Sequence, residues 1–512
     1  MPSLSRRDFL KLTTLLGAGA ALTTVRTRAS SLQNQKPNIV ILLADTMSAT
    51  NLSLYGYPRR TTPNLERLAE RAFVYHNHHS GGNYTTPGTA TVLTGSYPWT
   101  HRAFNLAAPV RRSLANQNVF RLIGSDYHRA AFTQNPLAEV YLRQFVAEID
   151  QHIPTSTFIL EQDKPGVSDF ITTDPLMAPY AIDDFLMSTH QPGTEWPGSL
   201  SMGYLGLVYG WLHRGSGQAT EEYPYGIPSN AFYHYENRTV YDGVRESILD
   251  LHRRRQPFFA YFHLMSPHAP YSPTREFVDT LAEMEFPTKK THILGNFFSR
   301  REMLANRKMY DEYIANVDAE MGRLFDALEQ ECVLENTYFI IVSDHGEMFE
   351  RGVIGHSTAL LNEPIINIPL LILPPGKQQR TDIQAFTSNT DVMPTILSIA
   401  GQKIPQGVEG RVLPGFGGIE DSQHPIFAVD ARESSSFLPL TRATMTMLKD
   451  SKKIIYYKGY KQLADSFELY DLHDDAAEKR DIYQQDPSTA KHMKDELLEH
   501  LEQAESSLRH EK

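Results

Sequence analysis

Two long apolar runs, each followed by acidic side chains, dominate the hydrophobic pattern of the chain. Residues 38–44 lead into Asp45, and residues 338–342 lead, after one serine, into Asp344 and His345. The length and β-branched content of both runs are typical of strands buried on both faces. Ligands of an open α/β sheet bind beyond the carboxyl ends of its strands, so these three polar side chains are expected in one crevice. They would form a site for a hard divalent metal ion. The alternative is that they are only polar residues at which buried strands end, with no role in binding.

Helical and strand-like segments alternate around these two runs. Apolar residues recur at helical spacing over residues 240–251 and 310–328, and a buried strand follows each segment, at 257–264 and 338–342. This alternation predicts a parallel sheet with helices on its faces. The same kind of pattern predicts further strands at residues 73–79, 129–133 and 369–373, and further helices at residues 65–72, 119–123 and 391–397.

Pro87 and Gly95 predict a short helix, because they are typical of the first helical position and of the residue after the last turn. Thr85 then lies just before the N-terminus of this helix, where free amides and the helix dipole stabilise negative charge. A hydroxyl group there can be deprotonated on a metal ion and can act as a nucleophile. The open alternative is that Thr85 or Thr86 is only the N-cap of the helix.

His268 follows the predicted strand at residues 257–264, in a loop rich in proline. A single loop histidine is more often structural than ligand-binding. Its position after another central strand nevertheless places it at the same edge of the sheet as Asp45 and Asp344, which favours a functional role.

The regular pattern is interrupted in two places, which divide the chain into predicted parts. Residues 155–235 are rich in Pro, Gly, Tyr and Trp without periodicity, and we interpret them as an irregular insertion that shapes the substrate pocket. Pro and Gly are frequent again at residues 404–418. We therefore predict a catalytic domain at residues 36–418 and a smaller C-terminal α+β subdomain at residues 419–512, which ends in an amphipathic helix at residues 493–508.

Residues 1–30 are typical of an export signal rather than of part of the fold. Arg6 and Arg7 precede a Phe-Leu-Lys sequence and a modest apolar stretch at residues 12–25, which resembles a twin-arginine signal. This predicts export by the twin-arginine machinery to the periplasm or the exterior of a prokaryotic cell. Later segments are too short or too polar to span a bilayer, so we expect no transmembrane segment in the mature protein.

Composition narrows the classes of partner. The formal net charge of −11 leaves no basic surplus to neutralise phosphates, so sequence-independent binding of nucleic acid is excluded. A local cationic pocket for a small anion is still compatible with this charge. The single cysteine, Cys332, excludes an intrachain disulfide framework.

Together, these motifs resemble those of the sulfatase-like group within the alkaline phosphatase superfamily. The resemblance covers most of residues 36–480 and rests on many motifs in the order of the family. It implies an α/β fold, an alkaline-phosphatase-like three-layer sandwich with a central, mostly parallel sheet, plus the smaller C-terminal α+β subdomain. The matching stretches are Pro37 to Asp45, Tyr55-Gly56, Thr62 to Asn64, Thr86 to Gly95, Pro267 to Tyr271, Ser343 to Glu347, Gly355-His356, Pro369 to Ile372 and Glu468 to Leu472.

The resemblance also implies roles for single residues. Thr85 matches the nucleophile, and His268 matches a histidine that contacts the transferred group. His356 matches a catalytic-site position whose role is less defined. The implied cofactor is a divalent metal ion, namely Mn, Zn, Mg or Ca. The positions that match metal ligands are Asp45, Thr85, Asp344 and His345.

Departures from the family pattern bear on the reaction. Sulfatases carry a Cys or Ser that is converted to formylglycine, whereas Thr85 would leave a ketone rather than an aldehyde. The arginine that usually follows is replaced by Thr89, and the usual second aspartate is replaced by Thr46. The usual Gly-Lys signature is missing from residues 131–136. A threonine nucleophile with this metal set instead resembles the phosphoryl-transferring branch of the superfamily.

The leading hypothesis is therefore a secreted, metal-dependent hydrolase that attacks a phosphate mono- or diester through a covalent Thr85 intermediate. The substrate is expected to be a small-molecule, lipid-head-group or glycan ester. One alternative is a sulfuric ester hydrolase that uses unmodified Thr85. Another is a catalytically inactive protein that binds an anionic ligand.

Overall fold

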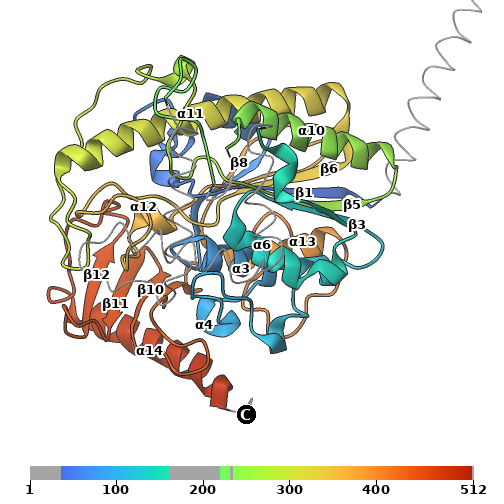
Figure 1. Cartoon of the computed structure of the whole chain (residues 1–512). Helices are drawn as coiled ribbons and strands as arrows, with labels where there is room; N and C mark the ends of the chain where they lie inside the picture. The colour runs from blue at the N-terminus through green and yellow to red at the C-terminus, as the bar shows by residue number, and fades with distance from the viewer. Residues whose placement is uncertain (1–35, 161–218, 231–233, 510–512) are drawn as a thin grey trace, which may run out of the picture.

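The computed structural model describes residues 36–160, 219–230 and 234–509, and it places them in two β-sheets covered by helices (Figure 1). The predicted export signal at residues 1–30 and most of the predicted insertion at residues 155–235 lie outside the described residues. Within the described ranges, none of the helices combines the length and apolar character needed to cross a membrane.

The larger sheet has eight strands in the order β4-β3-β5-β1-β6-β7-β2-β8. Neighbouring strands are parallel except at β7, which runs antiparallel to both β6 and β2. The predicted α/β fold with a mostly parallel sheet is therefore confirmed. The strands are β1 (Asn38–Ala44), β2 (Phe73–His79), β3 (His128–Thr133), β4 (Gln151–Ile153), β5 (Phe258–Leu264), β6 (Thr337–Val342), β7 (Leu370–Leu373) and β8 (Thr381–Ser388).

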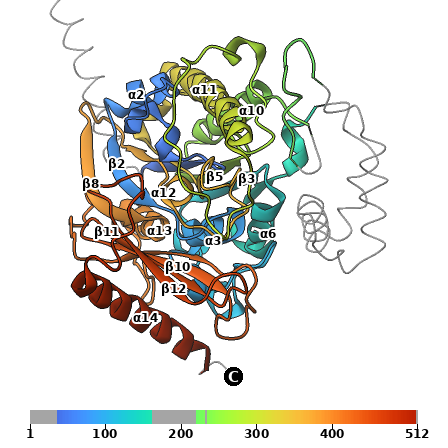
Figure 2. The ribbon, with the colours of Figure 1, turned by 90° about the vertical axis from the view of Figure 1, so that its left-hand side faces the viewer.

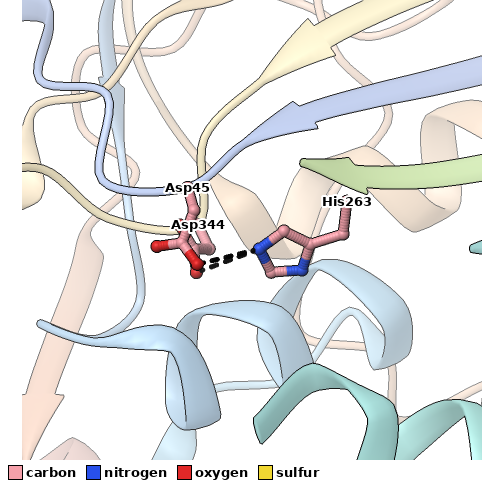
Figure 3. A group of neighbouring side chains, drawn as sticks. All are labelled: Asp45, His263 and Asp344. Atoms are coloured by element: carbon pink, nitrogen blue, oxygen red, sulfur yellow. Dashed lines mark hydrogen bonds and ion pairs between the residues drawn. The ribbon is translucent and has the colours of Figure 1, made fainter. Parts of the chain in front are cut away.

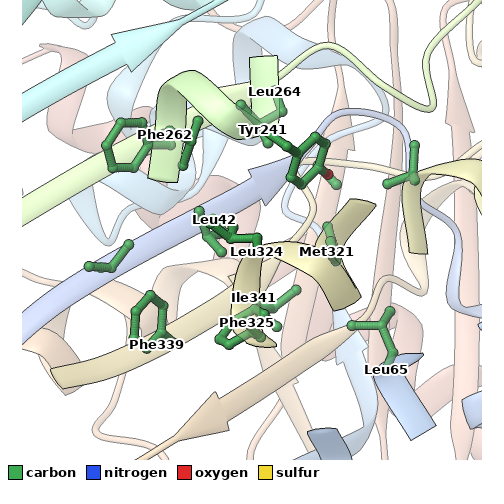
Figure 4. Close-up of a cluster of buried hydrophobic side chains, with 14 of the residues drawn as sticks. Leu42, Leu65, Tyr241, Phe262, Leu264, Met321, Leu324, Phe325, Phe339 and Ile341 are labelled. Atoms are coloured by element: carbon green, nitrogen blue, oxygen red, sulfur yellow. The ribbon is translucent and has the colours of Figure 1, made fainter. Parts of the chain in front are cut away.

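Strand β1 lies between β5 and β6 and is buried along its whole length. Successive side chains of a strand point to opposite faces of the sheet. Val40 and Leu42 pack against the helices of one face, and Figure 4 shows Leu42 there. Ile41 and Leu43 pack against the helices of the other face. The first face carries α2 (Pro63–Ala69), α10 (Asn237–Arg253) and α11 (Arg300–Gln330), and the second carries α3 (Thr85–Thr94), α5 (Val119–Leu122), α6 (Pro136–Gln144) and α13 (Val392–Ile399).

Helix α3 begins two residues earlier than the sequence indicates. Tyr84 is its N-cap, Thr85 is its first residue and Pro87 is its third residue. The first amides of a helix have no acceptor within the helix, so a proline at the third position removes no hydrogen bond. The alternative that Thr85 or Thr86 serves as the N-cap is therefore wrong.

A second, antiparallel sheet has the order β12-β11-β10-β9 and is covered on one face by helix α14 (Pro487–Arg509; Figure 2). Met493 and Leu497 of this helix pack against Met445 and Ile454 of the sheet. This confirms the predicted smaller C-terminal α+β unit, while its boundary at residue 418 stays a prediction. The strands are β9 (Ile426–Asp430), β10 (Ala443–Lys449), β11 (Lys452–Lys458) and β12 (Ser466–Asp471).

A buried ionic network joins the small sheet to the large one. Lys453 on β11 is fully buried, and its Nζ lies 2.8 Å from Glu363 Oε1 and 2.7 Å from Glu478 Oε1. Glu363, the first residue of α12 (Glu363–Ile366), also lies 3.1 Å from His79 Nε2 at the end of β2. Buried charges are tolerated only when they are paired in this way.

Replacing Lys453 by methionine is expected to lower the free energy of unfolding by about 3–5 kcal/mol, because two buried carboxylates lose their shared cation. The adjacent Lys452 provides a matched control. It pairs with Asp471 at the surface, so Lys452→Met should change the same quantity by less than about 1 kcal/mol. Urea denaturation measures both effects, and equal effects would contradict a stabilising role for the buried network.

Helix α3 is also held by a buried histidine of helix α4 (Pro98–His101). His101 Nδ1 accepts a hydrogen bond from Ala103 N at 3.0 Å, and His101 Nε2 lies 3.3 Å from Thr91 Oγ1 on α3. A ring nitrogen that accepts from a backbone amide carries no proton, so the ring is neutral. Burial lowers the pKa of His101 to about 3.

We expect His101 to make the protein less stable in mild acid. Below its ordinary pKa of 6.5, the unfolded state takes up a proton on this ring that the folded state excludes down to about pH 3. As the pH falls from about 7.5 to about 5, this difference in proton uptake should lower the free energy of unfolding by about 2 kcal/mol. His101→Gln should reduce the loss measured by urea denaturation, whereas the exposed His492→Gln should not. The same pH dependence in all three proteins would contradict this account.

Candidate active site

The carboxyl ends of three central strands meet at one buried site. Asp45 follows β1, Asp344 follows β6, and His263 lies near the end of β5 (Figure 3). One ligand atom from each of these residues lies within 4.8 Å of the others, and all three side chains are buried. His263 Nε2 is 3.3 Å from Asp45 Oδ2 and 3.8 Å from Asp344 Oδ2. The two carboxylates therefore converge, as expected for strand ends at one edge of a sheet.

His345 faces the same two carboxylates. Its Nε2 is 3.5 Å from Asp45 Oδ1 and 3.6 Å from Asp344 Oδ2. Its Nδ1 lies 3.0 Å from Gly346 O, and a ring nitrogen that bonds a carbonyl oxygen carries the proton. Burial and the charge of His356 lower the pKa of His345 well below its ordinary value. The neutral ring thus presents a lone pair on Nε2 to the carboxylates.

Thr46 fixes the orientation of Asp344. Its φ of 63° lies in the left-handed region, which is unusual for a β-branched residue. The Thr46 amide donates to Asp344 Oδ1 at 3.3 Å, and its carbonyl accepts from the Tyr310 hydroxyl at 2.6 Å. Asp344 Oδ1 also accepts from the His345 amide at 2.9 Å, so Oδ2 is the oxygen that faces the site.

The charges of this group suit a divalent cation. Burial raises the pKa of Asp45, but the hydrogen bond from His263 and the surrounding imidazoles outweigh burial and hold this pKa below its ordinary value. Burial and the charge of Asp45 raise the pKa of Asp344 well above its ordinary value. Among the described residues, three buried atoms of the group have no hydrogen-bond partner: Asp45 Oδ1, Asp344 Oδ2 and His345 Nε2. Oxygen and imidazole donors in this state fit the implied metal ion.

Thr85 lies beside the same group, because helix α3 packs against the end of β6. Asn135 Nδ2 donates to Asp45 Oδ2 at 2.5 Å and to Thr85 Oγ1 at 3.1 Å, so one amide connects the hydroxyl group and the carboxylate. Gly88 in the first turn of α3 makes the close approach possible. A Cβ atom at this position would lie 2.4 Å from Asp344 O.

The two other predicted histidines lie in a row beyond His345. The ring centroids of His345 and His356 are 4.4 Å apart, and those of His356 and His268 are 5.0 Å apart. His356 Nδ1 lies 3.1 Å from Glu347 Oε2, and His268 Nδ1 lies 2.6 Å from Ala269 O. Because Nδ1 is engaged in both rings, Nε2 is the nitrogen that can face a ligand.

Sequence reasoning missed two residues of this site, His263 and Asn135. In the register of β5 with β1, His263 lies beside Leu43, two residues before Asp45, which a strand pairing would have indicated. Asn135 caps helix α6 through Oδ1 and uses Nδ2 to reach the site. Its signal is an Asn-Pro pair one residue after a buried strand, which is typical of a helix start.

The profile described as Sulfatase matches residues 37–402, more than half of the chain. The chain belongs to the sulfatase family. A second profile, described as N-sulphoglucosamine sulphohydrolase, C-terminal, matches residues 356–507 and covers the small sheet. The expected resemblance to sulfatase-like proteins is thereby confirmed, and the family places this chain among hydrolases that act on ester bonds.

Known relatives of this sulfatase-family chain include enzymes of different specificity. The arylsulfatase of Clostridium perfringens is 22% identical over 415 residues, which are 74% of this chain and 78% of the relative. The phosphonate monoester hydrolase of Agrobacterium radiobacter has a TM-score of 0.65 at 18% identity, covering 91% of this chain and 96% of that structure. BT4656, in complex with its substrate D-glucosamine-2-N,6-O-disulfate, has a TM-score of 0.61 at 17% identity, covering 93% of this chain and 99% of that structure. The two structures share the fold.

Proposed function

We propose that this protein is a metal-dependent ester hydrolase that uses Thr85 as its nucleophile and acts on phosphate mono- or diesters. The observation that carries the proposal is the amide of Asn135, which bonds Thr85 Oγ1 and Asp45 Oδ2 and so holds a hydroxyl group at the edge of the buried carboxylates. A small molecule, a lipid head group or a glycan would carry the ester. Export through residues 1–30 is part of the proposal and rests on the Arg6-Arg7 motif.

The residues that would hold the divalent ion are Asp45, Asp344, His345 and His263, with Thr85 beside them. A bound ion would lower the pKa of a hydroxyl group and offset negative charge on the attacked ester. Carboxylates alone suit Mg or Ca, whereas imidazoles suit Zn, so a mixed set favours Zn or Mn. The second imidazole, His263, is the reason for this preference.

The side chains of the site supply the remaining chemistry. Thr85 Oγ1 would release its proton to solvent and form a bond to phosphorus while the bond from phosphorus to the leaving oxygen breaks. The leaving oxygen would take a proton from Nε2 of His268 or His356. Water would then cleave the Thr85 ester and regenerate the hydroxyl group. Asn135 orients Oγ1, and the free amides at the start of α3 stabilise the negative charge that develops.

A sulfuric ester hydrolase that uses unmodified Thr85 is the second candidate. The family match and the arylsulfatase relative favour it. The same displacement at sulfur would give a Thr85 sulfate ester. The residue type argues against it, because threonine cannot be converted to the formylglycine aldehyde on which ordinary sulfatases depend.

Turnover of three probes separates the two candidates. An aryl phosphate, a bis-aryl phosphate and an aryl sulfate would each be tested with protein loaded with Mn, Zn, Mg or Ca. We expect the fastest turnover with one of the phosphate probes. Preference for the aryl sulfate would replace the phosphate hypothesis by the second candidate, and no turnover with any probe and metal would contradict both.

A further inference from the structure

A single arginine of the C-terminal subdomain lies against the residue that precedes the candidate nucleophile. The end of β9 packs on the loop before α3, where the Val429 amide donates to Gly81 O at 2.9 Å. Two residues beyond this strand, Arg432 places its guanidinium carbon 3.9 Å from the ring centroid of Tyr84. Tyr84 is the N-cap of α3, and Thr85 follows it directly.

The guanidinium of Arg432 forms no ion pair within the described part of the chain. Its Nε is buried without a hydrogen-bond partner, and none of the ion pairs there includes this side chain. The neighbouring Glu433 is already paired with Arg442. Burial raises the pKa of Asp430, and the charge of Arg432 opposes this shift, but the two side chains do not form an ion pair.

The position of Arg432 is nevertheless fixed. Asn105 Nδ2 donates to Arg432 O at 2.8 Å and to Ser434 O at 2.9 Å, which holds the backbone of the loop. In contrast, the guanidinium of Arg102 has a structural role. It donates hydrogen bonds to the carbonyl oxygens of Ser435, Ser436 and Leu438 in the same loop. Arg432 retains its donors, and a guanidinium presents them in a planar fork that matches a carboxylate, sulfate or phosphate group.

We propose that Arg432 binds a second anionic group of the substrate, separate from the ester that is cleaved. The ligand class is an ester that also carries a carboxylate, sulfate or phosphate group, such as an acidic glycan. This inference rests on the proposed function, because it assumes that the ester is cleaved at Thr85, the residue that follows Tyr84. Stacking on Tyr84 restricts the guanidinium to one orientation, so less freedom is lost when the anion binds.

The test uses pairs of aryl ester probes, in whichever ester class the enzyme hydrolyses fastest. One member of each pair carries a carboxylate on a side chain, the other carries its neutral methyl ester, and the side chains increase in length. The measured quantity is the ratio of kcat/KM between the two members. We expect a ratio of about tenfold in favour of the carboxylate at the length that reaches Arg432.

Variants of Arg432 assign the preference to this residue. The ratio should fall to about one in Arg432→Gln and be partly retained in Arg432→Lys, because lysine keeps the charge but lacks the planar fork. Arg442→Gln, in the same loop, should keep the ratio. A wild-type ratio near one at every length would overturn the proposal, as would an unchanged ratio in Arg432→Gln.

A binding measurement separates failure of this inference from failure of the proposed function. Calorimetric titration of the metal-loaded Thr85→Ala protein with the same probe pairs needs no turnover. A preference for the carboxylate probe that depends on Arg432 would support the inference even if no probe is hydrolysed. Equal affinities for both members at every length would overturn it even if the phosphate probes are hydrolysed.

Discussion

Replacing Thr85 by alanine is expected to lower kcat for the preferred aryl ester by about 10⁴-fold or more, because the attacking oxygen is removed while the rest of the site stays in place. Thr85→Ser is the matched control. It keeps the hydroxyl group that Asn135 orients, so kcat should stay within about tenfold of the unmodified protein.

Rapid-quench experiments add a direct readout of the covalent step. An ester on residue 85 should be detected during turnover in the unmodified protein and in Thr85→Ser. It should be absent in Thr85→Ala. Unchanged kcat in Thr85→Ala would remove Thr85 from the mechanism. Loss of activity in both variants, with intact metal binding, would show that the methyl group rather than the hydroxyl group is needed.

Replacing Asp344 by asparagine is expected to abolish the stabilisation that Zn or Mn gives to the protein. A ligand present at about 100 times its dissociation constant adds about 2.7 kcal/mol to the free energy of unfolding. Asp344 Oδ2 faces the site, and an uncharged amide in its place is a much weaker ligand. The metal-free variant should be about as stable as the metal-free protein, because burial and the charge of Asp45 raise the pKa of Asp344 and so already favour its uncharged form when no metal is bound.

Thermal denaturation with a chelator and with added metal measures this difference. Asp326→Asn is the control, since its carboxylate lies at the surface in an ion pair with Arg67. This variant should keep the full metal-induced shift. The same shift in Asp344→Asn would contradict the assignment of Asp344 as a ligand.

The sequence predicts the sheet and the carboxylates because both depend on local patterns. Runs of β-branched residues identify β1 and β6, and parallel strands that end at one edge bring Asp45 and Asp344 together. The helices that cover the sheet follow from apolar residues at helical spacing. The resemblance to a family assigned Thr85 to the same site, which periodicity alone left open between nucleophile and N-cap.

The residues that were missed depend on contacts between segments far apart in the chain. His263 joins the site through the register of β5 with β1, and Asn135 joins it through the turn after β3. Neither register nor turn geometry can be read from a single buried run. Arg432 lies more than three hundred residues after Tyr84, so only the packing of β9 against the loop before α3 reveals their contact.

Anomalous X-ray diffraction from crystals grown with Zn or Mn tests the central claim most directly. The account predicts one strong anomalous peak, from a metal ion bound by Asp45, Asp344, His345 and His263 next to Thr85 Oγ1. A well-ordered crystal with no peak at this group, or with the ion bound only by surface carboxylates, would contradict it.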